Sequence, residues 1–301
     1  MRKFHVYIET EGALEQLYDC FMQLHAMGVE ICLHSLLRGL MRGGRPEAAA
    51  ETVKDMGLAD RETALYLTDI PQLASMLAAG HYPVIAYVHD GNRNTPLLHV
   101  KYVIEGFEDV DAQYFIRVYQ RLTGQPWHIL DTARCRIRET TAEDVDAFYG
   151  IYREMSVTRY MEDLFADRDR EIQYIRDYSE KVYAFYGFGM WTVLLKETGE
   201  VIGRAGISMR EGCDDPELGF VIGVPWQRQG FAEEVCRAIL RYAGEELHFG
   251  RVQALVHPEN SPSVSLLAKL GFVYSGEVTS GGQAYSYYLC HINPQRPFPL
   301  T

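Results

Sequence analysis

The fold of this chain is decided by residues 217–234, which begin with Glu217-Leu218-Gly219-Phe220-Val221-Ile222 and continue through Gln227-Arg228-Gln229-Gly230-Phe231-Ala232. The stretch reads as a buried strand, a turn and the start of a helix. At such a junction the first N–H groups of the helix have no acceptor within it and lie at the positive end of its dipole. This arrangement binds a phosphate or pyrophosphate, and Gly230 and Ala232 allow the ligand to approach closely.

The glycine spacing in this stretch differs from the common phosphate-binding motifs. A Walker loop ends in Gly-Lys-Ser/Thr and the dinucleotide fingerprint is Gly-x-Gly-x-x-Gly, whereas this stretch reads Gln-x-x-Gly-x-Ala. Three further elements follow in order: a strand-like run Val252-Gln253-Ala254-Leu255-Val256, then Asn260-Ser261-Pro262-Ser263, then Lys269-Leu270-Gly271-Phe272.

This ordered set resembles the GCN5-related N-acetyltransferases (GNAT), and its last two elements resemble the ribosomal-protein N-acetylase-like branch of that family. The resemblance covers about Arg134 to Leu289. It implies an α+β domain with a mixed, largely antiparallel sheet over residues 132–301. It also implies an N-acetyltransferase that transfers an acetyl group from acetyl-CoA to a primary amine, by direct attack in a ternary complex.

The resemblance implies a set of residues that bind acetyl-CoA. Main-chain groups of the strand would bond the pantetheine arm, and those of the loop would bond the pyrophosphate. The residues are Phe220, Val221, Ile222, Val224, Gln227, Arg228, Gln229, Gly230, Phe231, Ala232, Asn260 and Ser263. The guanidinium of Arg228 suits phosphate oxygens, although a solvated loop residue is an equal reading. Alternatively, Asn260 is a turn residue before Pro262 without a role in binding.

Two residues are candidates for catalysis. An alkyl amine is mostly protonated at pH 7 and must lose a proton before it attacks, so a nearby carboxylate can serve as a general base. Glu217 begins the strand where the family often places such a base, although an exposed strand-end glutamate is an equal reading. Many family members have a Tyr general acid seven residues after the Asn, but here that position is Leu267. The acid is then Ser263, a water or another Tyr, or it is dispensable.

Aromatic residues between positions 160 and 191 are candidates for the acceptor pocket. They could hold an amine partly by cation–π contact, although core packing is the commoner role of such residues. We assign Tyr160, Tyr186 and Trp191 to the pocket. Glu162 and Asp163 could add acidity there or simply face solvent.

Residues 1–131 are predicted to form a Rossmann-like α/β domain. We expect strands at 4–8, 64–68, 83–88 and 101–104, and helices at 14–27, 46–56, 71–79 and 111–123. The segment from Leu65 to Ile104 resembles the C-terminal half of haloacid-dehalogenase-like (HAD-like) phosphatases, with Asp69 at the position of their metal-binding acid. Their Asp-x-Asp nucleophile is missing, because Glu9-Thr10-Glu11 follows the first strand. We therefore interpret this domain as degenerate and non-catalytic.

In the second half, the pattern predicts a strand at 135–140, a helix that Thr141 caps and that runs to Tyr152, and a helix at 170–186. A hairpin is expected from the strands 190–195 and 201–207.

Composition narrows the partners. The 301 residues suit two domains, and the net charge of −12 disfavours nucleic acid and favours a cationic or amine partner, or serves only solubility. The six cysteines include no Cys-x-x-Cys pair and the ten histidines no His-x-x-x-His pair, so no metal site is expected. No apolar run reaches the ~20 residues of a membrane span, and the first residues do not read as a signal peptide. We expect a cytoplasmic protein, with a homodimer possible.

Two other functions stay open. One is a non-catalytic acyl-CoA-binding regulatory module, which the missing Tyr at Leu267 favours. The other is a phosphatase activity of the first domain, which the missing Asp nucleophile disfavours.

Overall fold

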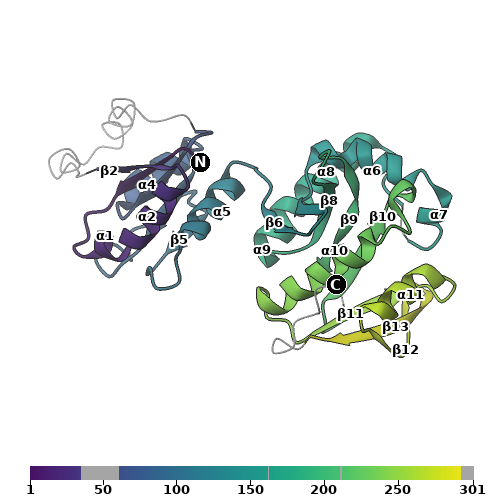
Figure 1. Ribbon diagram of the computed structural model, residues 1–301. Helices are drawn as coiled ribbons and strands as arrows, with labels where there is room; N and C mark the ends of the chain where they lie inside the picture. Colours follow the sequence, from purple (N-terminus) through teal and green to yellow (C-terminus); the bar gives the residue numbers. More distant parts are fainter. Residues whose placement is uncertain (35–60, 162, 211, 293–301) are drawn as a thin grey trace. The chain divides into compact units, whose positions relative to one another are not determined.

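The computed structural model describes residues 1–34, 61–161, 163–210 and 212–292, and it divides into two compact units at 1–125 and 126–301 (Figure 1). This division precedes the predicted boundary after Asp131, because His128–Asp131 forms strand β6 and pairs with the next strand of the second unit. The helix predicted at 46–56 lies outside the described residues. Among the described helices, none combines the length and apolar character that a membrane span requires.

The first unit is a parallel α/β structure, as predicted. Its five strands have the order β2-β1-β3-β4-β5, and every neighbouring pair is parallel. The strands are β1 (Lys3–Tyr7), β2 (Glu30–Leu33), β3 (Ala64–Thr68), β4 (Val84–Tyr87) and β5 (Tyr102–Ile104). The helices are α1 (Ala13–Gln16), α2 (Tyr18–Ala26), α4 (Pro71–Ala79) and α5 (Ala112–Leu122). All residues of β3 and β4 are buried, which explains why both were evident as continuous apolar runs.

Asp69 lies directly after β3, at the carboxyl edge of the sheet. Its Oδ2 accepts hydrogen bonds from the N–H groups of Glu9 and Thr10 at 2.9 and 2.8 Å and from the Thr10 hydroxyl at 2.6 Å. The carboxylate therefore ties the loop after β1 to the end of β3.

The second unit contains an eight-stranded sheet with the order β12-β13-β11-β10-β9-β8-β7-β6. Each neighbouring pair is antiparallel except β10 and β11, which are parallel, so the predicted mixed and largely antiparallel sheet is confirmed. The strands after β6 are β7 (Cys135–Glu139), β8 (Met190–Leu195), β9 (Val201–Ser208), β10 (Glu217–Ile222), β11 (Arg251–Val256), β12 (Val273–Ser280) and β13 (Gln283–His291).

Helices cover both faces of this sheet (Figure 1). On one face α10 packs over β9 and β10 and completes the main core, and on the other α6 and α8 form a smaller core with Val221 of β10. The helical elements are η2 (Ala142–Asp144), α6 (Val145–Tyr152), α7 (Met155–Thr158), α8 (Arg168–Tyr178), the π-helical turn η3 (Ser179–Tyr183), α9 (Ala184–Tyr186), η4 (Val224–Trp226), α10 (Phe231–Glu245) and α11 (Ser261–Lys269). The helix predicted at 170–186 thus contains a π-helical turn.

The predicted cap at Thr141 is a full capping box with Asp144, which is 3% exposed. Burial disfavours the charge of Asp144. The hydrogen bonds from Arg138, from the Thr141 N–H and from Thr192 outweigh that effect and hold the pKa of this carboxyl below its usual value. Both Arg138 contacts to Asp144 are 2.7 Å long. This pair joins the start of α6 to β7 and β8.

Asp144→Asn is expected to lower the free energy of unfolding at pH 7 by about 3–5 kcal/mol, because it leaves Arg138 partly buried without its counter-ion. A native carboxyl with a depressed pKa stabilises the fold above its unfolded pKa, and this stabilisation is lost as the pH falls through the native pKa. Urea unfolding across pH 2–7 should therefore show a shallower acid loss in the variant. Asp146→Asn removes an exposed partner of Arg168 and should change little; equal effects of both variants would contradict this.

Candidate functional site

Strands β10 and β11 part from each other almost at once. They pair at a single position, Glu217 with Gln253, and the Gln253 N–H also donates to the Pro216 carbonyl at 2.8 Å. On its other side β10 stays paired with β9 along its whole length, to Ile222. The edge of β10 that faces β11 is therefore unpaired beyond its first residues.

Alternation along the strand decides which main-chain groups face this opening. The Pro216 carbonyl bonds β11, whereas the Gly223 N–H donates to the Ile202 carbonyl of β9 at 2.9 Å. Because main-chain groups of alternate residues lie on the same side of a strand, those of Phe220 and Ile222 face the opening. Those of Val221 face β9, so the main chain of this predicted contact does not line the opening.

The loop between η4 and α10 is held in shape by its own glutamines. The Gln227 Nε2 donates to the Ile222 carbonyl at 2.8 Å, and the Gln229 Nε2 donates to the Pro225 carbonyl at 2.7 Å. Both side chains therefore act within the protein, and a ligand would meet the main chain of these residues. Arg228 and Gly230 have φ of 59° and 82°, which bend the chain sharply before the helix.

The start of α10 offers unpaired donors in open space. In the part of the chain that the structure describes, the N–H groups of residues 228–233 have no protein acceptor, and the Glu234 N–H donates to the Gly230 carbonyl at 3.0 Å. A Cβ at Gly230 would meet one atom within 4 Å, the Arg134 Nη2 at 3.5 Å. Open space before the unpaired end of a helix of 15 residues fits a pyrophosphate.

Arg134, between β6 and β7, contacts this loop and was not among the predicted site residues. Its guanidinium lies 4.0 Å from the centroid of the Phe231 ring, donates to the Gln229 carbonyl at 3.1 Å and pairs with Glu234 at 2.7 Å. It therefore places the cationic half of an ion pair beside Gly230. No local signal could reveal it, since Arg134 precedes Gln229 by 95 residues.

Asn260 and Ser263 lie at the same edge of the sheet as this loop, because β10 and β11 are parallel and both end there. Asn260 caps α11, with its Oδ1 accepting from the Ser263 N–H at 3.3 Å. Its amide nitrogen points to no acceptor among the described residues. Leu267 is fully buried in the core, and its side chain has no proton to give to a leaving group.

Glu217 is a buried carboxylate, 9% exposed, at the point where β10 and β11 part. Both of its oxygens accept from Arg210, one from Nε and one from Nη2 at 3.0 Å. The Arg210 Nη1 also donates to Ser280 at 3.3 Å. The reading of Glu217 as an exposed strand end is therefore wrong, and the carboxylate has a cationic partner that the sequence analysis did not foresee.

The three aromatic residues assigned to the acceptor pocket lie in different places. Tyr160 stacks on His257 with centroids 4.9 Å apart, at the edge where β11 ends. Tyr186 joins Phe188 and through it Phe249, which precedes the other end of β11. A strand of this length spans about 20 Å, so Tyr160 and Tyr186 do not share a pocket. Asp163 is exposed, and Glu162 lies outside the described residues.

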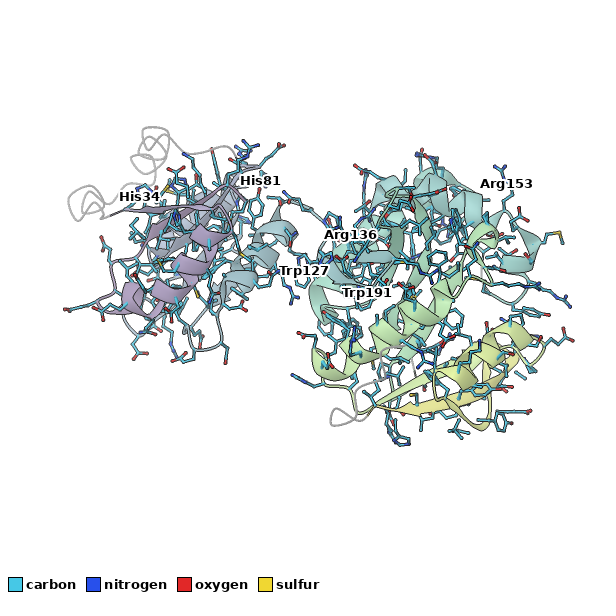
Figure 2. All side chains as sticks on the ribbon, in the orientation of Figure 1. His34, His81, Trp127, Arg136, Arg153 and Trp191 are labelled. Carbon is cyan, nitrogen blue, oxygen red and sulfur yellow. The ribbon has the colours of Figure 1, made fainter. Side chains whose placement is uncertain are left out.

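The structure contradicts the assignment of Trp191 to the pocket. This side chain, marked in Figure 2, is 0% exposed and packs edge-to-face on Tyr242 of α10, with centroids 5.7 Å apart. It therefore belongs to the core face of the sheet, opposite the face that α6 and α8 cover.

Trp191→Ala is expected to lower the free energy of unfolding by about 3–5 kcal/mol, as for other buried aromatic truncations. The KM for an amine acceptor should not change selectively. Thermal and urea unfolding, together with acceptor titrations of the folded fraction, measure the two effects. A raised acceptor KM at unchanged stability would instead return Trp191 to the pocket.

Comparisons with known proteins agree with this geometry. Residues 134–273 match the family model described as an acetyltransferase (GNAT) domain. The chain is 33% identical over 153 residues to an uncharacterized N-acetyltransferase, p20, of Bacillus licheniformis, covering 49% of this chain and 83% of that protein. It is 35% identical over 104 residues to the [ribosomal protein uS5]-alanine N-acetyltransferase of Escherichia coli K12, covering 34% of this chain and 52% of that protein.

A crystal structure of a GNAT-family acetyltransferase from Bacillus anthracis is 22% identical, with a TM-score of 0.47, covering 56% of this chain and 99% of that one. The ordered motifs of residues 217–272, the parted strands β10 and β11 and the match to p20 converge, and the chain belongs to the GNAT family of acetyltransferases.

Proposed function

We propose that the second unit transfers the acetyl group of acetyl-CoA to a primary amine, by direct attack while donor and acceptor are bound together. The observation that carries this proposal is the opening between β10 and β11, which leads to the unpaired N-terminus of α10. A long ligand with amides at one end and a diphosphate at the other matches that pair of features.

The donor would be held mainly by main-chain groups. The main-chain groups of Phe220 and the N–H of Ile222 would bond the pantetheine amides, and the N–H groups of residues 228–232 would bond the pyrophosphate. Arg228 and Arg134 would add positive charge beside the phosphates, and the free amide nitrogen of Asn260 would donate to the arm. When bound, acetyl-CoA supplies an activated acetyl thioester.

Glu217 is proposed as the group that receives the proton of the acceptor ammonium, directly or through one water. Its position where the strands part places it beside the opening, on the side of the sheet away from α10. Arg210 holds both carboxylate oxygens, so it must release at least one when the acceptor enters. Ser263 is retained as a proposed donor to the leaving thiolate, because its N–H fixes it against Asn260.

The acceptor is proposed to enter near Tyr160 and His257. These two rings, together with an ion pair of Arg159 and Glu259 at 3.5 Å, connect the segment after α7 with the turn after β11. The similar enzyme of Escherichia coli is named for an alanine of a ribosomal protein. Small-molecule and peptide amines are therefore both acceptor candidates for this chain.

An acyl-CoA-binding regulatory module is the second candidate, and the burial of Leu267 favours it. A panel of primary amines with acetyl-CoA and a thiol-release readout discriminates the two, with binding of acetyl-CoA followed by calorimetry. Binding with release that depends on the amine supports the transferase. Binding without release supports the module, and absence of binding rejects both.

For the first unit we propose a degenerate HAD-like domain without catalysis. Its support is the use of Asp69, whose Oδ2 is occupied by three donors from the loop after β1. A carboxylate committed to that loop acts as a structural tie.

A further inference from the structure

Arg204 on β9 is a buried arginine without an acidic partner. It is 9% exposed, and its Nε has no acceptor within the described part of the chain. Its guanidinium carbon lies 4.8 Å from the centroid of the Phe148 ring, yet none of the described carboxylates pairs with it. Arginine keeps its proton in proteins, so the charge persists without a carboxylate beside it, and burial of the unpaired Nε is costly.

Arg138 shows how an arginine on the same face of this sheet is otherwise neutralised. Arg138 lies opposite Thr192, and Thr192 lies opposite Arg204, so the three form one row across β7, β8 and β9. Arg138 donates to both oxygens of Asp144 at 2.7 Å. Arg204 occupies the equivalent position two strands away without such a carboxylate.

The groups that surround Arg204 are phenols. Four tyrosines lie near its guanidinium, Tyr152, Tyr183, Tyr174 and Tyr178. Burial raises the pKa of Tyr152, Tyr178 and Tyr183, so these three are neutral at pH 7. Two of the hydroxyls are engaged with the main chain of Met190. Arg204 is itself hydrogen bonded to Tyr152. The cluster therefore holds one net positive charge among neutral hydrogen-bonding groups, and the Nε of Arg204 is the donor without an acceptor.

The face of the sheet that carries Arg204 also carries Glu217. Directly opposite residues share a face, and the register of β9 with β10 gives three successive rows: Arg204 with Val221, Gly206 with Gly219, and Ser208 with Glu217. The middle row has no side chain on either strand. The Met190 Sδ lies over it, 2.9 Å from where a Cβ of Gly219 would be. Since Met190 is half-buried and a thioether is flexible, it can yield this space to a ligand.

We propose that Arg204 binds a carboxylate of the acceptor, so that the acceptors of this enzyme are amines that also carry a carboxylate, such as amino acids and short peptides. This inference rests on the proposed acetyl transfer beside Glu217. A carboxylate matches the planar fork of a guanidinium. Its single negative charge neutralises the single positive charge of the cluster, whereas a phosphate dianion would leave an excess buried charge.

The test compares acceptors that differ by one carboxylate: phenylalanine against phenethylamine, lysine against cadaverine, and 6-aminohexanoate against hexylamine. With the full-length protein, kcat/KM should be about 100-fold higher for the acid of at least one pair, the scale of a charge-assisted bidentate contact. Arg204→Met should lower kcat/KM for the acid to the value for its amine and leave kcat/KM for the amine unchanged. Arg204→Lys should give the acid a kcat/KM between those of the wild type and Arg204→Met, because it keeps the charge and loses the planar pair of donors.

Stability separates this role from a structural one. Removing a buried charge that lacks a carboxylate partner should leave the thermal midpoint of Arg204→Met unchanged or higher, whereas Arg138→Met should lower it by stranding Asp144. N-acetylphenylalanine or 6-acetamidohexanoate should raise the midpoint of the wild type and not that of Arg204→Met. This measurement requires no turnover.

Equal kcat/KM within all three pairs would overturn the proposal while leaving acetyl transfer intact. If Arg204→Met lowers kcat/KM equally for the acid and for the amine and also lowers the thermal midpoint, Arg204 is structural. If the wild type turns over neither member of any pair, the thermal midpoint decides. The proposal is overturned when neither acetylated acid raises the midpoint of the wild type. Failure of the proposed function itself would show separately, as an absence of acetyl-CoA binding in calorimetry.

Discussion

Gly230→Glu is expected to abolish measurable binding of acetyl-CoA, with Kd raised by at least about 100-fold, equivalent to about 2.7 kcal/mol. Gly230 has a φ of 82°, a region that costs a side-chain-bearing residue about 1–2 kcal/mol. The larger effect is electrostatic, because a carboxylate would stand where the N–H groups of α10 should meet the pyrophosphate. Isothermal calorimetry with acetyl-CoA measures the change directly.

Gly187→Glu is the matched control for this variant. Gly187 follows α9 with a φ of 74°, and a Cβ there meets nothing within 4 Å. It introduces the same backbone strain and the same charge just before β8, at the edge of the sheet where β10 begins and opposite the edge where the loop lies. The control should bind acetyl-CoA like the wild type. If Gly230→Glu binds equally well, the loop does not hold the diphosphate.

Glu217→Gln is expected to lower kcat about 10²–10⁴-fold, the range that general base catalysis contributes, without changing the Kd for acetyl-CoA. The amide keeps the size of the side chain but cannot accept the ammonium proton. Stopped assays of thiol release with a saturating amine measure kcat, and calorimetry checks the donor affinity. Unchanged turnover would remove Glu217 from the mechanism.

Arg210→Met distinguishes the base from the ion pair. Like Glu217→Gln it removes the ion pair, but it leaves the carboxylate in place. Because this variant also removes the cation that an acceptor must displace, it should retain most of the turnover. Equal losses in both variants would mean that the ion pair matters through the position of β10, and that Glu217 is not the base.

Local sequence patterns predicted those strands and helices whose bounds depend on neighbouring residues in the chain. The bounds of β3, α4, β8 and β10 agree with the predicted ranges, because these segments carry buried apolar runs ended by Gly, Pro or a polar turn. The hairpin strands β12 and β13 were not predicted, and β12 shows why. Most of its residues are exposed, so it has no alternation of buried and exposed positions.

The candidate site likewise contains features that depend on local sequence and features that depend on contacts between distant segments. The glycine loop, the cap at Asn260 and the position of Glu217 follow from short motifs, because main-chain geometry at a strand–helix junction depends on neighbours in the chain. Arg134, the Arg210 partner of Glu217 and the burial of Trp191 depend on contacts between distant segments. The prediction that Trp191 and Tyr186 share a pocket with Tyr160 rested on aromatic content alone. In the structure the three residues lie at different positions relative to the sheet.

By itself, the sequence determined the family, the glycine-containing turn before α10 and the division into a parallel and a mixed α/β unit, since each depends on order and spacing along the chain. Tertiary structure alone decided which charges lack partners and which face of the sheet a side chain joins. Burial and ion pairing arise only when strands come into register. The sequence therefore could not distinguish Arg138, which pairs with a carboxylate, from Arg204, which does not.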